Sequence, residues 1–312
     1  MVPSGVSPFM TDPAEVHALL EHLGTAVSVS SRMPERVFRP NYTQVHFLEF
    51  SLFAWDEFWT LLQCLLKESQ DQNVSLVVLD PDPERYVLTE FGRFGVIDVP
   101  VTASAEQYRK ALNGPGPTPD TLMLISEVMV WFPPSLQWLI WGERGTETML
   151  LAYEQGFHGV AATAIKDTGI SLLTAEDALN LSSPAWRDRA ARARFARRLM
   201  DNYGDGRPWV DDAPERALAF AHKLIAGEMS VIEASRALSS LRWEFDAPEN
   251  YLFLPFVGID SETDELPIGS VRREWARDSL ALKDVEIARC EQAYRPRAVE
   301  ACRKLIEYLR AG

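Results

Sequence analysis

The stretch from Thr121 to Tyr153 constrains the fold more than any other, because it is the most apolar region of the chain and holds three of its nine tryptophans. Leu122–Phe132 is rich in β-favouring residues, which predicts a strand. A Pro-Pro pair breaks this strand, and Gln137–Trp141 has the alternation of a returning strand. The sequence therefore predicts a buried hairpin over residues 121–142, at the centre of an α/β domain. We expect Thr146–Tyr153 to begin a helix after it.

A chain of 312 residues is long enough for two domains, and its pattern of secondary-structure signals changes once along the sequence. We place the domain boundary at Ser182-Ser183-Pro184. Residues 1–183 mix strand and helix signals, so we expect a mixed sheet with helices. Residues 184–312 carry mainly helical signals. The predicted fold class is therefore α+β, with an acidic N-terminal α/β domain and a C-terminal, mainly helical domain.

Local signals predict several elements. Asp12 has the position of a helix N-cap, and Ser104 and Ser230 each open the pattern of a capping box. Further predicted elements are a helix over Trp55–Lys67, strands over Val74–Leu79 and Gly95–Val99, an extended segment over Tyr251–Ile259, an acidic loop over Asp260–Gly269, and separate helices over Ser279–Ala293 and Arg297–Arg310.

Negative charge is concentrated in the first part of the chain. Residues 1–180 hold 10 Lys and Arg against 23 Asp and Glu, whereas residues 181–312 hold 21 against 22. Such a surface repels nucleic-acid phosphates and attracts basic partners. Its alternative role is to keep the protein in solution. We therefore expect no nucleic-acid partner. The candidate partner-binding residues are five acids that flank predicted strand ends: Asp80, Asp82, Glu84, Glu90 and Asp98.

Missing motifs exclude several classes of site. The nucleophile motifs GxSxG and SxxK and the phosphate loops GxxxxGK and GxGxxG do not occur. The three cysteines form no CxxC pair, which argues against a disulfide framework or a zinc site. No apolar run reaches the length of a membrane span. We therefore expect a cytoplasmic protein with no membrane association, no cofactor and no resident metal.

An acidic segment suggests a metal-dependent hydrolase as an alternative. Asp260, Glu262 and Asp264 alternate like the first ligands of a calcium loop, and His158 is a candidate catalytic partner for them. The rest of the loop pattern fails, because Glu265 occupies the position that needs glycine. The simpler interpretation, which we favour, is a solvated turn for the acids and a hydrogen-bonded structural role for His158.

An arginine-rich segment is the strongest basic feature. Between residues 187 and 198 the chain has six arginines and one acid, Asp188. The arginines go round the predicted helix and do not form one stripe, so we favour pairing with acids of the first domain over a nucleic-acid site. They are Arg187, Arg189, Arg192, Arg194, Arg197 and Arg198.

Two stretches carry a family resemblance. Trp131–Arg144, with its WFPPS and WLIWGER motifs, resembles a segment of bacterial proteins encoded near polymorphic or type VI secreted toxins. Phe256–Gly269, followed by Arg272 and Trp275, resembles the C-terminal domain of similar bacterial proteins. The resemblance implies an immunity-type protein, which is a cytosolic binder that blocks its cognate toxin. It implies no catalytic residues.

The leading hypothesis is therefore a non-enzymatic immunity protein whose acidic first domain binds a basic toxin, such as a nuclease. The alternatives are the metal-dependent hydrolase and a bacterial adaptor without a toxin partner. A toxin gene beside this one would favour immunity over the adaptor. The sequence leaves the oligomeric state open.

Overall fold

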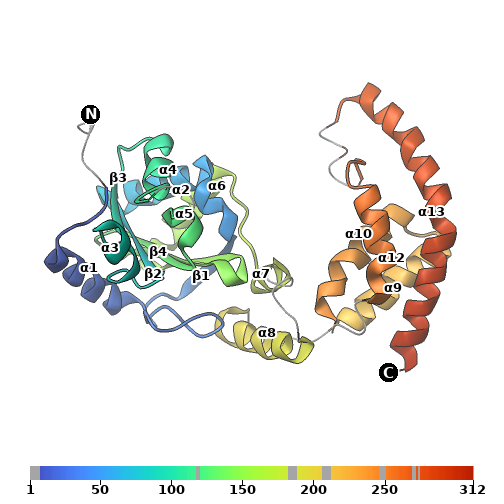
Figure 1. The fold of residues 1–312 in the computed structure, drawn as a ribbon, viewed down its shortest axis with the longest axis horizontal. Coiled ribbons are helices and arrows are strands. Elements are labelled where there is room, and N and C mark those ends of the chain that lie inside the picture. The colour runs from blue at the N-terminus through green and yellow to red at the C-terminus, as the bar shows by residue number, and fades with distance from the viewer. Residues whose placement is uncertain are drawn as a thin grey trace. The chain divides into compact units, whose positions relative to one another are not determined.

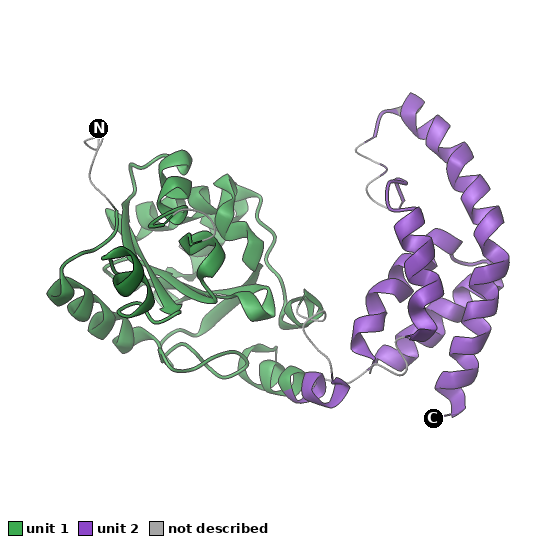
Figure 2. Cartoon of the chain, viewed as in Figure 1, with its two compact units in different colours: residues 1–185, 195–208 green, residues 186–194, 209–312 purple. Residues whose placement is uncertain are grey.

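A computed structural model describes residues 8–116, 120–181, 188–205, 212–245, 251–268, 272 and 275–311. The chain divides into two compact units (Figure 2). Unit 1 comprises residues 1–185 and 195–208, and unit 2 comprises residues 186–194 and 209–312. The predicted boundary at residues 182–184 lies outside the described residues.

Unit 1 is built on a six-stranded sheet in the order β1-β6-β5-β4-β2-β3 (Figure 1). The strands are β1 Gln44–Glu49, β2 Asn73–Asp80, β3 Val96–Pro100, β4 Val128–Phe132, β5 Trp138–Glu143 and β6 Thr148–Tyr153. With helices around this sheet and a helical second unit, the predicted α+β class is confirmed. We expected a mixed sheet, and this prediction is wrong for the described strands. All of the described strand pairs are antiparallel.

The predicted central hairpin is confirmed, since β4 and β5 pair with Trp131 opposite Ile140 and are buried along their length. Two flanking predictions are wrong. Leu122–Ile125 forms a short helix, α5, and the segment expected to begin a helix at Thr146 forms the strand β6. β6 is a strand because it lies between β1 and β5 and pairs with both, which outweighs its local propensity.

One face of the sheet is covered by helices α2 (Asp56–Ser69), α4 (Ala105–Leu112) and α6 (His158–Thr168), as Figure 1 shows. A hydrophobic core of unit 1 lies between these helices and the sheet. Trp59 of α2 and Trp131 of β4 are both fully buried members of it. The helical spacing predicted over residues 55–67 therefore matches the buried face of α2.

The opposite face is covered by the segment that follows α1 (Pro13–Ala26). The N–H of Met33 donates to Glu143 of β5 at 2.8 Å. The hydroxyl of Tyr42 donates to the carbonyl of Leu136 at 2.7 Å. Both faces of β5 are therefore covered by protein, which explains why this strand is apolar on both sides.

Unit 2 is helical, and its helices α9 (Ala213–Ala226), α10 (Val231–Leu241), α12 (Leu254–Glu262) and α13 (Arg277–Ala311) share one core. The predicted separate C-terminal helices are one continuous helix, α13, with Pro296 inside it.

The extended segment predicted over Tyr251–Ile259 is wrong. A short 3-10 turn leads directly into α12. Phe253, Phe256 and Ile259 recur at every third position and are fully buried, which is the spacing of a helix face and not of a strand. The remaining helices are α3 (Tyr86–Phe91), α7 (Ala175–Leu181) and α8 (Arg189–Tyr203).

The predicted helix starts are confirmed by their caps. Asp12 accepts the backbone N–H two residues further on at 2.8 Å. Ser104 and Gln107 make both bonds of a capping box at α4. Ser230 accepts the N–H of Glu233 at 3.1 Å at the start of α10. These elements were predictable because each cap depends only on residues close in sequence.

Candidate functional site

The end of β2 carries the first predicted acids to the surface of unit 1. Asp80 is exposed at the last position of the strand. The carboxylate of Asp82 accepts the N–H of Glu84 at 2.9 Å, which is the geometry of an Asx turn. The short helix α3 follows, carries the exposed Glu90, and ends at Gly92 with a φ of 64°. Four of the five predicted partner-binding acids therefore lie on one segment, residues 80–90.

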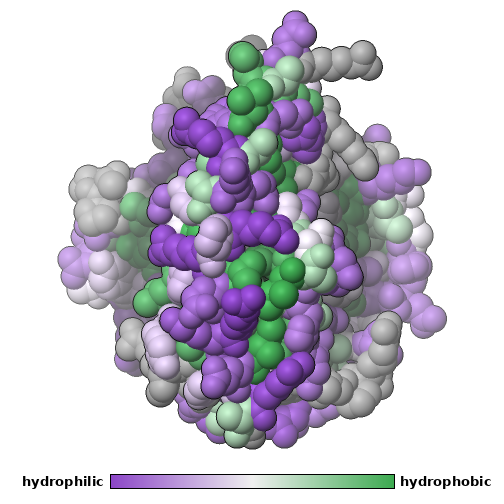
Figure 3. Space-filling model, turned by 90° about the vertical axis from the view of Figure 1, so that its right-hand side faces the viewer, coloured by the Kyte–Doolittle hydropathy of each residue, from purple (hydrophilic) through white to green (hydrophobic). Residues whose placement is uncertain are grey.

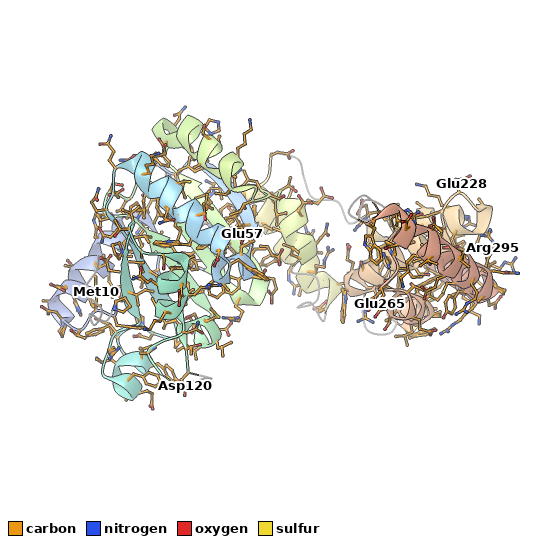
Figure 4. The ribbon with its side chains drawn as sticks, turned by 90° about the horizontal axis from the view of Figure 1, so that it is seen from above. Met10, Glu57, Asp120, Glu228, Glu265 and Arg295 are labelled. Atoms are coloured by element: carbon orange, nitrogen blue, oxygen red, sulfur yellow. The ribbon has the colours of Figure 1, made fainter. Side chains whose placement is uncertain are left out.

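Two further acids join this segment from the region before β4. The N–H of Glu127 donates to the carbonyl of Asp80 at 2.8 Å. The hydroxyl of Tyr86 donates to Asp120 at 3.4 Å, and Asp120 lies beside α3 in Figure 4. We call the six residues the α3 acidic surface: Asp80, Asp82, Glu84, Glu90, Asp120 and Glu127.

Sequence reasoning missed Asp120 and Glu127, because they lie far from α3 along the chain. The β2–β4 pairing, which sets Asp80 opposite Val128, brings them there. A prediction of that pairing would have been the only signal for them.

Tyr86 is the exposed aromatic residue of this surface, with 38% of its area accessible. Desolvation raises the pKa of its hydroxyl, and the negative charges of Asp120 and Glu90 raise it further. Tyrosine is one of the residues that typically anchor protein interfaces.

Few cations oppose the α3 acidic surface. His17 lies 2.8 Å from Glu84, Arg85 lies 4.0 Å from Asp82, and Arg144 lies 4.0 Å from Glu127. The first two pairs are largely solvent-exposed and the third is long, with a partly buried Arg144, so each contributes little to stability. Among the described residues, these pairs set two guanidinium groups and one imidazole against six carboxylates, which leaves an excess of negative charge.

Asp98, the fifth predicted acid, lies elsewhere. Its carboxylate accepts from the side-chain amide of Asn73 at 2.6 and 2.7 Å and from the hydroxyl of Ser75 at 3.0 Å. It is half-buried and sits opposite Ser75 in the β2–β3 ladder. Five strand residues, or about 17 Å, separate that position from Asp80. Asp98 therefore stabilises the sheet edge and is not part of the α3 acidic surface.

The acids proposed for the hydrolase lie in unit 2, where each contacts a different group. Asp260 and Glu262 lie on helix α12, and not on a loop as expected. Asp260 pairs with Arg236 at 3.5 Å, and Glu262 accepts the hydroxyl of Tyr294. The carboxylate of Asp264 accepts the N–H of its neighbour at 2.8 Å. Each carboxylate therefore has its own partner, and the solvated turn that we favoured is wrong for Asp260 and Glu262, which lie on the helix.

His158 belongs to unit 1, at the start of α6. Its Nδ1 lies 3.3 Å from the hydroxyl of Tyr153, and Nε2 of His46 lies 2.7 Å from the same oxygen. Burial lowers the pKa of His46, and the charge of His158 lowers it further. His158 therefore sits in a His-Tyr-His chain. In the part of the chain that the structure describes, no three His, Cys, Asp or Glu residues gather as a metal site would need.

The arginine-rich helix α8 pairs with acids of both units. Arg198 lies 2.8 Å from Glu35, which is the predicted pairing with the first domain. Arg192 is buried and lies 3.0 Å from Glu244, an acid of unit 2, so the prediction is wrong for this residue. Arg192 pairs with an acid of unit 2 because residues 189–194 of the helix belong to that unit. Residues 195–203 belong to unit 1. Arg187 lies outside the described residues.

Comparison with protein-family models, curated proteins and solved structures found no match to the chain. Among the residues described, no helix has the length and apolar composition needed to cross a membrane.

Proposed function

We propose that this protein is a cytoplasmic, non-enzymatic immunity protein that captures a basic protein toxin through the α3 acidic surface. The observation that carries the proposal is that six acidic residues from two chain segments, residues 80–90 and 120–127, meet on unit 1, where the exposed Tyr86 contacts Asp120 through its hydroxyl. The sequence resemblance to immunity-type proteins supplies the class of partner.

The charge pattern supports binding to a basic partner. An excess of exposed acids raises the local concentration of a cationic protein and speeds its encounter, an effect that salt weakens. Tyr86 offers an apolar ring with a polar tip, and such a side chain loses little conformational freedom on binding. Charge would therefore set the association rate, and the ring would slow dissociation.

The hydrolase alternative has no comparable support. It requires Asp260, Glu262 and Asp264 to converge on one ion, whereas each is held by a separate local contact. The adaptor alternative shares the binding surface with our proposal and differs only in the partner. Identification of the partner separates the two.

The test is affinity capture from the native host, with mass spectrometry of the retained proteins. The reversal variant carries lysine at Asp80, Glu90 and Glu127, whose carboxylates hold no backbone group among the described contacts. A control variant carries lysine at three exposed acids away from this surface, Glu68, Glu106 and Glu176, and so has the same net charge.

We expect the wild type and the control variant to retain one basic, toxin-like protein in equal molar amount, and the reversal variant to lose it. Equal retention by all three proteins would refute the assignment of the surface. A retained protein without a toxin activity, as judged by growth arrest on its expression, would refute immunity and support the adaptor.

A further inference from the structure

The N-terminal half of α13 extends beyond the core of unit 2. The residues that α13 contributes to that core all lie at Tyr294 or later. Figure 1 shows the earlier turns of α13 running on past α10 and α12. About four helical turns before residue 293 therefore present a face that the described part of the chain does not cover.

That face carries a four-residue stripe. Asp278, Leu282, Val285 and Arg289 follow one another at spacings of four, three and four, which places them on one side of the helix. Leu282 and Val285 are 78% and 72% exposed, the highest values for large apolar side chains among the described residues. Figure 3 shows hydrophobic residues among hydrophilic ones on the face that it draws.

Other charged residues in this part of α13 already form ion pairs within the chain. Lys283 pairs with Glu286 at 2.9 Å, and Arg272 pairs with Asp284 at 2.7 Å. Asp278 and Arg289, in contrast, have no ion pair with any described residue. They lie eleven residues apart on one helix, or about 17 Å, so they cannot pair with each other.

We propose that this stripe binds the same stripe of a second copy of the chain in antiparallel orientation. A two-fold axis between Lys283 and Asp284 would set Leu282 against Val285 of the second copy. The same axis would set Asp278 beside Arg289 of the second copy, at both ends of the contact. The stripe is therefore complementary to itself in charge and in apolar character.

A parallel arrangement is disfavoured by the same charges, because it would set Asp278 beside its own counterpart and Arg289 beside its own counterpart. Ala281 and Ala288 flank the stripe on one side, and their small side chains allow the two helices to approach closely. The contact is only about 17 Å long, so we expect a weak, concentration-dependent dimer and not an obligate one.

Sedimentation equilibrium of the full chain tests the proposal, over concentrations from about 1 µM to about 1 mM. We expect the weight-average mass to rise from that of one chain towards that of two. Asp278→Arg and Arg289→Asp should each weaken dimerisation by about tenfold or more. Each substitution places two side chains of like charge beside each other at both ends of the contact. The double variant Asp278→Arg/Arg289→Asp exchanges the charges and should restore dimerisation.

The double variant is the matched control, because it contains both substitutions and keeps the net charge of the wild type. Circular dichroism should show the same helix content for all four proteins, since the changed residues are exposed. A wild type that stays monomeric throughout would overturn the proposal. The proposal would also be overturned if the single substitutions left the dimerisation affinity unchanged, or if the double variant failed to restore that affinity.

Discussion

The carboxylate of Glu291 in α13 accepts the backbone N–H groups of Val231 and Ile232, at 2.7 and 3.0 Å. These are the first two residues of α10, so one helix of unit 2 caps another. The N–H groups at a helix start have no partner within the helix, and a carboxylate there also meets the positive end of the helix dipole.

Glu291→Ala should therefore lower the free energy of unfolding of unit 2 by about 1–2 kcal/mol. Urea unfolding, monitored by circular dichroism, measures the loss. Glu300→Ala is the control, because Glu300 lies on the same helix and, among the described residues, its side chain makes only an exposed ion pair with Lys304. An equal effect of both substitutions would show that Glu291 does not act as a cap.

Trp131 belongs to the hydrophobic core of unit 1. It is fully buried, and its indole N–H donates to the hydroxyl of Tyr108 at 3.1 Å. Trp131→Ala should cost about 3–5 kcal/mol of unfolding free energy, since it leaves a large cavity. Trp55→Ala should cost less than about 1 kcal/mol, because Trp55 is 60% exposed. The same urea experiment compares them, and equal losses would contradict the position of the core.

Glu143 should make the stability of unit 1 depend on pH. Burial raises the pKa of its carboxyl group above the ordinary value of 4.5, although hydrogen bonds from Met33 and Trp141 act in the other direction. The folded protein therefore holds this proton more tightly than the unfolded chain does. The stability that the protonated group contributes is complete below the ordinary pKa and is lost as pH rises through the raised one.

Glu143→Gln should remove that dependence, because the amide oxygen can still accept both hydrogen bonds and carries no charge. We expect the unfolding free energy of the variant to fall less than that of the wild type between about pH 4 and about pH 8. Glu147→Gln, at an exposed position, should leave the wild-type dependence unchanged. Parallel curves for wild type and Glu143→Gln would contradict the raised pKa.

The features that could be predicted from the sequence are those set by nearby residues. The caps at Asp12 and Ser104 involve partners within three positions, and the central hairpin is marked by its Pro-Pro turn. The strand β6 could not be assigned, because it owes its conformation to β1, which lies about a hundred residues earlier. The α12 helix could have been assigned, since the spacing of Phe253, Phe256 and Ile259 was visible in the sequence.

The candidate site was predictable only in part, for the same reason. Asp80, Asp82, Glu84 and Glu90 share one short segment, so their proximity follows from the chain itself. Asp120 and Glu127 reach the surface through pairing of β2 with β4, which no local pattern reveals. Asp98 was grouped with the others by its place near a strand end, but the antiparallel register puts it at the far end of β2.

The most direct test of electrostatic capture is the rate of association with the purified partner, measured by stopped-flow fluorescence from about 0.05 M to about 0.5 M salt. We expect the rate to fall steeply with salt for the wild type and for the Glu68/Glu106/Glu176 control variant. The Asp80/Glu90/Glu127 reversal variant should associate slowly, with little dependence on salt. The same steep dependence in all three proteins would contradict capture by the α3 acidic surface.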